Sequence, residues 1–185
     1  MSKAEKIEFL SNEGQDILQR LSYMIRYNNE IHIHNENVAE HSFYVAVYTL
    51  LICDFLGIES SDAVKFALIH DVSEIITSDI PHNVKNELFA IGKICDEFER
   101  DFNNVNFGIK YHIEGDGLPE VVVALADILS VRQYALKEVE YGNIGKFGPI
   151  LQGSSKRLAE AFHKLGRYIP EDKIKELEIL IKGEN

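Results

Sequence analysis

Residues 63–74 of the chain, AVKFALIHDVSE, run from an apolar helical segment into a polar ending. Apolar residues recur at helical spacing up to position 69, where His70 and Asp71 follow directly. Adjacent helical residues point about 100° apart, so these two side chains can contact one bound ion only if it lies near the rim of the helix. Glu74 falls one turn beyond His70, on the same side. The stretch therefore predicts a buried helix that ends at a polar site.

Helical periodicity extends outward from this stretch over nearly the whole chain, and strictly alternating runs are almost absent. This pattern predicts an all-α fold. Asn37 followed by Glu40 has the form of a capping box, and Gly57 marks the end of that helix. The other main helices are expected over residues 13–27, 83–103, 119–142, 150–165 and 170–182. With 185 residues, the chain is expected to form a single domain over 1–185, in which helices within 143–185 are accessory.

Composition and charge exclude several classes of function. The formal net charge of −11 repels polyanions, so binding of nucleic-acid polymers is not expected. Residues 1–10 lack the continuous apolar stretch of a secretion signal. The longest apolar runs, 45–56 and 121–131, are shorter than the ~20 residues that span a bilayer, so both are expected to be buried helices. These features predict a cytoplasmic protein with no membrane partner.

Two further polar residues interrupt apolar helix faces. Asp127 lies in the middle of a helix, 121–134, that is apolar on nearly all sides. An unpaired buried carboxylate is costly, so Asp127 needs a cation, a metal or a proton. Taken alone, it is explained equally well by a buried ion pair and by a metal site. His41 also lies on a buried stripe, where a lone histidine is usually a hydrogen-bonded core residue.

Considered together, His41, His70, Asp71 and Asp127 offer two imidazoles and two carboxylates from three helices. Such a nitrogen and oxygen shell suits one divalent ion such as Mn²⁺, Co²⁺, Fe²⁺ or Zn²⁺, with Mg²⁺ as a further candidate. Four protein ligands leave one or two positions of a six-coordinate metal open for water and a phosphoryl oxygen. The set therefore predicts a hydrolytic metal centre.

This ligand set resembles the H…HD…D signature of the HD-domain superfamily of metal-dependent phosphohydrolases. The closer local resemblance is to bacterial 5′-deoxynucleotidases and their oxetanocin-type relatives, over residues 26–127. Its motifs are NENVAEHS at 35–42, HDVSE at 70–74, SDIP at 78–81 and VK at 84–85. The resemblance implies a helical bundle around one central metal ion, and a homodimer.

The resemblance also implies roles for residues around the metal. Arg26 would bind the substrate phosphate, Tyr27 would pack against the sugar where a 2′-hydroxyl would clash, and Asp79 would accept a hydrogen bond from the 3′-hydroxyl. Lys85 is expected to help stabilise phosphoryl charge, and Glu74 to transfer a proton at the attacking water or the leaving oxygen. The relatives carry tryptophan at the position of Tyr27, so a weaker preference for deoxyribose is expected.

The expected reaction is release of phosphate from (deoxy)nucleoside 5′-monophosphates. A deoxynucleoside triphosphate hydrolase is the alternative enzyme, which extra cations near Lys85, such as Lys93, would favour. A (p)ppGpp hydrolase fits less well, because Glu74 is followed by Ile75 rather than by a second acidic residue. A non-catalytic nucleotide-binding regulator is the alternative from another class, but a regulator has no need of a base beside the metal.

Overall fold

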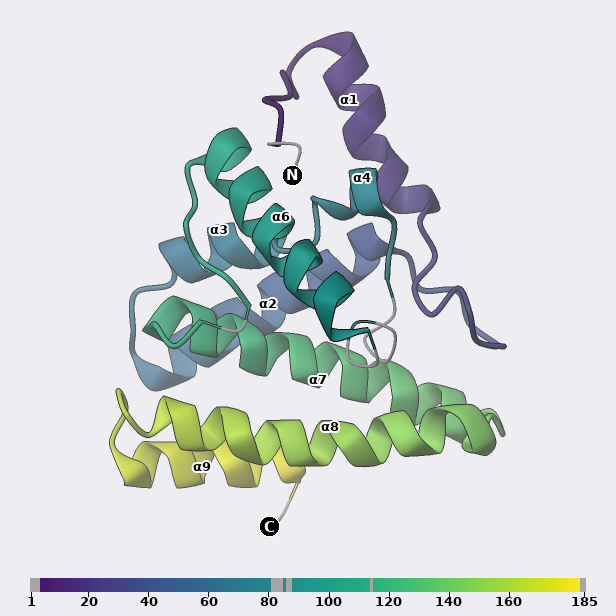
Figure 1. Cartoon of the computed structure of the whole chain (residues 1–185). Helices are drawn as coiled ribbons and strands as arrows, with labels where there is room; N and C mark the ends of the chain where they lie inside the picture. The colour runs from purple at the N-terminus through teal and green to yellow at the C-terminus, as the bar shows by residue number, and fades with distance from the viewer. Residues whose placement is uncertain (1–3, 81–84, 86–87, 114, 184–185) are drawn as a thin grey trace.

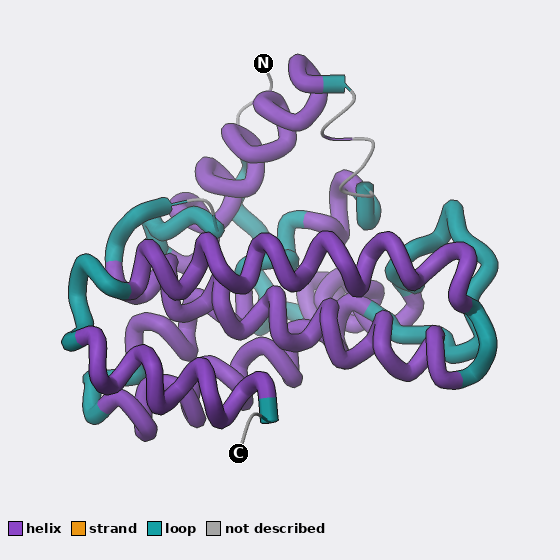
Figure 2. The backbone as a smooth tube through the Cα atoms, turned by 90° about the horizontal axis from the view of Figure 1, so that it is seen from below, coloured by secondary structure: helices purple, strands orange, loops and turns teal. Residues whose placement is uncertain are grey.

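The computed structural model describes residues 4–80, 85, 88–113 and 115–183. Within these residues the regular structure is helical, and the chain forms no strand there. One isolated antiparallel bridge joins Ile25 to Asn37. Figure 2 shows the helices joined by loops throughout the described part. The predicted all-α class is confirmed.

The helices cross in stacked layers (Figure 1). Helix α7 packs against α2, α3 and α8, and α9 packs on the far side of α8. Helices α1 and α6 lie above this assembly in Figure 1, at the end opposite to α9. The elements are α1 (Asn12–Gln19), the 3-10 helix η1 (Arg20–Tyr23), α2 (Val38–Leu56), α3 (Ser61–Ile69), α4 (Glu74–Thr77), α6 (Phe89–Phe107), α7 (Leu118–Glu140), α8 (Ile144–Leu165) and α9 (Glu171–Lys182).

Helix α7 is central because apolar side chains cover most of its circumference. Between positions 121 and 128, every residue except Ala124 is buried. Full burial of a valine or leucine side chain contributes about 1.5–3 kcal/mol, so this segment supplies much of the core. Asp127 is buried in the same segment and therefore lies at the centre of the molecule.

Helix α2 begins and ends where the sequence predicts. The amide of Glu40 donates to Asn37 Oδ1 at 2.9 Å, and the amide of Asn37 donates to Glu40 Oε2 at 3.1 Å. Gly57 ends the helix in a left-handed conformation with φ 70°. This start places His41 one turn inside the helix, facing the core with 0% exposure.

The outer face of α2 differs from the expected buried helix. By length and composition the helix could cross a membrane, yet 44% of its most apolar 18-residue stretch is buried inside the fold. Its other side exposes apolar residues to solvent. These are Phe43, Tyr44, Val47, Leu50 and Leu51, which we call the α2 outer face.

The first predicted helix, 13–27, is too long. Helix α1 ends at Gln19, and after η1 the chain becomes extended at Met24. The cause is tertiary: the amide of Arg26 donates to Glu36 O at 2.9 Å, and the amide of Val38 donates to Met24 O at 3.0 Å. These bonds place Arg26 in a loop beside the N-terminal end of α2.

The start of one other helix differs from its predicted position. Helix α8 begins at Ile144, six residues before the predicted start at 150, and contains Pro149. Phe147, within this added turn, is fully buried, so packing outweighs the local helix-breaking residues. Helix α6 is described from Phe89, and the predicted start at 83 lies outside the described residues.

Candidate functional site

Four side chains from three helical segments meet at the centre of the bundle. The ligand atoms of His41, His70 and Asp71 lie within 4.8 Å of one another. Asp71 Oδ2 is 3.2 Å from His70 Nε2 and 3.6 Å from His41 Nε2. Asp127, from α7, places Oδ1 3.2 Å from His41 Nε2. The fold therefore brings together the four residues predicted as metal ligands.

The end of α3 allows consecutive residues to face the same point. His70 is the C-terminal cap of α3, and the chain turns immediately after it. The amide of Val72 donates to Ile69 O at 3.0 Å, and the amide of Glu74 donates to Asp71 O at 3.0 Å. Because the helix stops here, His70 and Asp71 lie at its rim, as their adjacency requires.

Both histidines are oriented by a contact at Nδ1, the ring nitrogen that points away from the ligand cluster. His70 Nδ1 lies 2.7 Å from the carbonyl oxygen of Ala67, which can only accept, so Nδ1 carries a proton and donates it. His41 Nδ1 lies 3.1 Å from Ser130 Oγ on α7. Both Nε2 atoms are buried and lack a hydrogen-bond partner of acceptable geometry. Two oriented, unpartnered nitrogens beside two carboxylates fit a divalent cation.

Burial and neighbouring charges separate the pKa values of these groups. Burial, assisted by Arg26, lowers the pKa of His41 to about 4. Burial acts in the same direction on His70, but the Asp71 carboxylate outweighs it and raises the pKa of His70 to about 9. Burial disfavours the charged form of Asp71 and of Asp127, yet His70 beside Asp71, and His41 and Arg157 beside Asp127, hold both pKa values well below the usual range. Both carboxylates are therefore ionised and available to a cation.

Arg26 and Asp79 meet at one corner of the site, although 53 positions separate them in the sequence. The amide of Tyr27 donates to Asp79 Oδ2 at 3.1 Å. Arg26 Nη1 lies 3.4 Å from Glu36 Oε2, with both side chains largely buried. Tyr27 and Ser78 both have left-handed backbones, with φ 56° and 61°. Such strain costs about 1–3 kcal/mol at a non-glycine residue and clusters at functional sites.

The ring of Tyr27 lies in an aromatic box formed by α7 and α8. It stacks on Tyr134 with ring centroids 5.2 Å apart and an interplanar angle of 4°. Phe147 meets it edge-on at 5.4 Å, and the Arg26 guanidinium carbon lies 5.5 Å from its centroid. These neighbours pack against the ring and fix its position beside Arg26.

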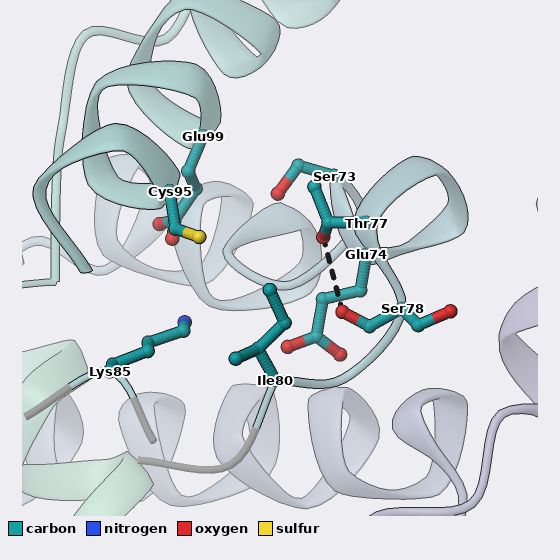
Figure 3. Close-up of a pocket in the computed structure, with 8 residues that line it drawn as sticks. All are labelled: Ser73, Glu74, Thr77, Ser78, Ile80, Lys85, Cys95 and Glu99. Carbon is teal, nitrogen blue, oxygen red and sulfur yellow. Dashed lines mark hydrogen bonds between the residues drawn. The ribbon is translucent and has the colours of Figure 1, made fainter. Parts of the chain in front are cut away.

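Glu74 and Lys85 line one pocket beside the ligand cluster (Figure 3). Burial, followed by the charges of Asp71 and Asp79, raises the pKa of Glu74 well above its usual range. Oε2 of Glu74 is buried without a hydrogen-bond partner. Lys93 is not among the lining residues described. The pocket is lined by Ser73, Glu74, Thr77, Ser78, Ile80, Lys85, Cys95 and Glu99.

Two residues near the site were not predicted from the sequence. Glu99, from α6, lines the pocket of Glu74, and burial together with Asp71 raises its pKa to about 8. Three other acidic residues lie on the same amphipathic helix, so no sequence pattern distinguishes Glu99 from them. Arg157, from α8, donates from Nη2 to Asp127 Oδ2 at 3.1 Å. Its signal was a charge on a helix face that is otherwise apolar or small.

Comparison with known proteins identifies the family. The family model for YfbR-like 5′-deoxynucleotidases matches residues 15–169. The chain belongs to this family. A 5′-deoxynucleotidase of Shewanella oneidensis is 28% identical over 148 residues, which are 68% of this chain and 74% of that protein. Membership of the YfbR-like family makes the chain an HD-domain phosphohydrolase, as its motifs predict.

Solved structures share the fold of this YfbR-like chain at low sequence identity. A protein from Pyrococcus horikoshii is 22% identical and aligns with a TM-score of 0.64, over 94% of this chain and 97% of that one. The HD phosphohydrolase DatZ of cyanophage S-2L, solved with dA and one catalytic Zn²⁺ ion, is 17% identical. Its TM-score is 0.62, over 90% of this chain and 93% of DatZ. The predicted HD-domain architecture is confirmed.

Proposed function

We propose that the protein is a metal-dependent 5′-deoxynucleotidase that releases inorganic phosphate from 2′-deoxynucleoside 5′-monophosphates. The observation that carries this proposal is the bond from the Tyr27 amide to Asp79 Oδ2. It joins the loop of Arg26 to the segment after Glu74, beside the ligand cluster. Groups that can bind a phosphate, bind a sugar hydroxyl and transfer a proton therefore surround the ligand cluster.

The substrate-binding roles follow from charge and position. Arg26 binds the phosphate, because its buried guanidinium faces the charges of Asp71 and Asp127 and remains protonated. Asp79 accepts a hydrogen bond from the 3′-hydroxyl through the oxygen that Tyr27 does not occupy. Lys85 adds positive charge on the side of Glu74. Together these groups orient a nucleoside monophosphate with its phosphate toward the ligand cluster.

His41, His70, Asp71 and Asp127 would hold one divalent ion. When bound, the ion supplies charge stabilisation to a phosphoryl oxygen and lowers the pKa of a water molecule. Glu74 takes a proton from the attacking water or passes one to the leaving 5′-oxygen. The donor set suits Mn²⁺, Co²⁺, Fe²⁺ or Zn²⁺ better than Mg²⁺, which prefers oxygen ligands. The Zn²⁺ ion of DatZ fits this range.

A substrate panel tests the proposal. Deoxy- and ribonucleoside mono- and triphosphates are assayed with Mn²⁺, Co²⁺ and Mg²⁺, and phosphate and longer polyphosphates are measured separately. We expect phosphate from the deoxynucleoside monophosphates and little polyphosphate from the triphosphates. Predominant release of triphosphate would instead identify a deoxynucleoside triphosphate hydrolase. Binding without turnover would identify a regulator.

Changing Tyr27 tests the sugar pocket. Tyr27→Trp is expected to raise the deoxy-to-ribo ratio of kcat/KM roughly 10-fold, mainly by rejecting the ribonucleotide, because the larger ring extends toward the 2′ carbon. Tyr27→Phe separates the effect of the hydroxyl from that of ring size. An equal or lower ratio in Tyr27→Trp would show that position 27 does not line the sugar pocket.

We also infer a homodimer that forms through the α2 outer face. This face contains two aromatic and three aliphatic side chains that are at least 36% exposed. Large exposed apolar patches usually mark interaction sites. A second copy is the favoured occupant, since the five side chains carry no charge and so add nothing to the repulsion that a net charge of −11 imposes between two copies. The cytoplasmic location expected from the sequence stays a prediction.

The dimer is tested by placing charge on this face. The double variant Leu50→Glu, Leu51→Glu should be monomeric in light scattering, because burying two carboxylates in an apolar interface is costly. Leu180→Glu is the matched control, since Leu180 on α9 is equally apolar and 64% exposed. A wild-type monomer, or a double variant that remains dimeric, would contradict this interface.

A further inference from the structure

Arg157 connects helix α8 to a candidate metal ligand. Its Nη2 donates to Asp127 Oδ2 at 3.1 Å, while Asp127 Oδ1 lies 3.2 Å from His41 Nε2. The two oxygens of one carboxylate are therefore divided between two neighbours. One oxygen faces the ligand cluster, and the other is held by a helix that the sequence analysis considered accessory.

The backbone of Arg157 is fixed by the packing of α8 on α7. Ser154 and Ala161 flank it on the same helix face and are 2% and 6% exposed. The Arg157 side chain is 39% exposed and the Asp127 side chain 13%. The guanidinium thus approaches a buried carboxylate from the rim of the site, and its planar donors restrict the orientation of that carboxylate.

We propose that Arg157 is a positioning residue of the metal centre, which holds Oδ2 of Asp127 so that Oδ1 stays directed into the ligand cluster. The proposal deepens the proposed function and rests on its metal site. It makes α8 part of the functional architecture. It also unites the two sequence-based interpretations of Asp127, because this carboxylate belongs both to an ion pair and to the ligand cluster.

Two physical effects of Arg157 on metal affinity oppose each other. A positive charge near the site repels a divalent cation, whereas an oriented carboxylate binds it more tightly. Because Arg157 is partly exposed, solvent screens its charge and weakens the repulsion. Loss of an outer partner of a metal ligand typically lowers metal affinity or activity about 10- to 100-fold. We therefore expect orientation to outweigh repulsion.

Metal titration of the full chain tests the proposal without relying on activity. Co²⁺ affinity is measured by calorimetry, and the Co²⁺ absorption spectrum reports coordination, for wild type, Arg157→Met and Arg157→Lys. Arg157→Met should bind Co²⁺ about 10- to 100-fold more weakly, with an altered spectrum. Arg157→Lys should recover part of the affinity, since it keeps a charged donor without the planar fork.

Arg132→Met is the matched control. Arg132 also joins α7 to α8, by donating to Ser155 Oγ at 3.1 Å, but it contacts none of the four candidate ligands in the described structure. It should leave the Co²⁺ affinity unchanged. If both arginines only stabilise the packing of α7 against α8, both Met variants would lower the melting temperature of the metal-free protein and leave the Co²⁺ affinity unaltered. That result would overturn the proposal.

The remaining outcomes separate this proposal from the proposed function. Unchanged or tighter Co²⁺ binding by Arg157→Met, with normal binding by wild type, would overturn the positioning role and leave the metal centre in place. A wild-type protein that binds no Co²⁺, Mn²⁺ or Zn²⁺ would overturn the metal-dependent function, and the role of Arg157 with it.

Discussion

Asp127→Ala is expected to lose stoichiometric metal and all detectable phosphate release. Asp127 is buried on the central helix, and its Oδ1 lies 3.2 Å from His41 Nε2, so its loss removes one of the two carboxylates beside that histidine. Loss of an outer partner of a ligand already costs about 10- to 100-fold in affinity, so loss of a direct ligand should cost at least about 100-fold.

Metal-dependent thermal unfolding measures this loss independently of turnover. A metal at 100 times its Kd stabilises the folded state by about 2.7 kcal/mol, and this stabilisation should disappear in Asp127→Ala. Asp54→Ala, at an exposed aspartate of α2, serves as the control and should keep the metal-dependent shift. Stoichiometric metal in Asp127→Ala at low free concentration would remove Asp127 from the ligand set.

Glu74→Gln should keep the metal and lose about 10²- to 10⁴-fold in kcat, the usual contribution of general acid-base catalysis. Oε2 of Glu74 is buried without a hydrogen-bond partner, so no described contact of that oxygen is lost. Burial and the charges of Asp71 and Asp79 raise its pKa, which favours the protonated form that can donate to a leaving oxygen. Melting temperature and metal affinity should therefore stay close to those of wild type while the rate falls.

Glu99→Gln is the matched comparison for Glu74. Both carboxylates line one pocket and both have raised pKa values, but Glu99 comes from α6 rather than from the segment that follows the ligands (Figure 3). Glu99→Gln should retain most of the rate. The opposite pattern, with turnover lost in Glu99→Gln and kept in Glu74→Gln, would transfer the proton-transfer role to Glu99.

Local chemistry explains which helix boundaries could be predicted. The boundaries of α2 depend on Asn37, Glu40 and Gly57, whose capping contacts and backbone conformation involve only residues a few positions away in the sequence. The end of α1 depends on Arg26 pairing with Glu36 across a loop, which no local pattern encodes. Helical periodicity continues past this point in the sequence, so it predicts a longer helix than the fold allows.

The candidate site also contains residues that the sequence can select and residues whose place depends on helix packing. His41 and Asp127 could be selected from the sequence because a polar residue on a buried stripe requires a partner. The identity of those partners depends on which helices pack together. The partner of Arg157 depends on the packing of α8 against α7, and the place of Glu99 in the pocket of Glu74 depends on the packing of α6.

The central claim is that this ligand cluster and its neighbours release phosphate from deoxynucleoside monophosphates with a divalent ion. The most direct measurement is inorganic phosphate release from the four common 2′-deoxynucleoside 5′-monophosphates by the metal-free protein, before and after addition of Mn²⁺, Co²⁺, Zn²⁺, Fe²⁺ or Mg²⁺. We expect no phosphate release before the ion is added, and release after its addition that is lost in Asp127→Ala. Equal release by the metal-free protein, or no release with any of the five ions, would contradict it.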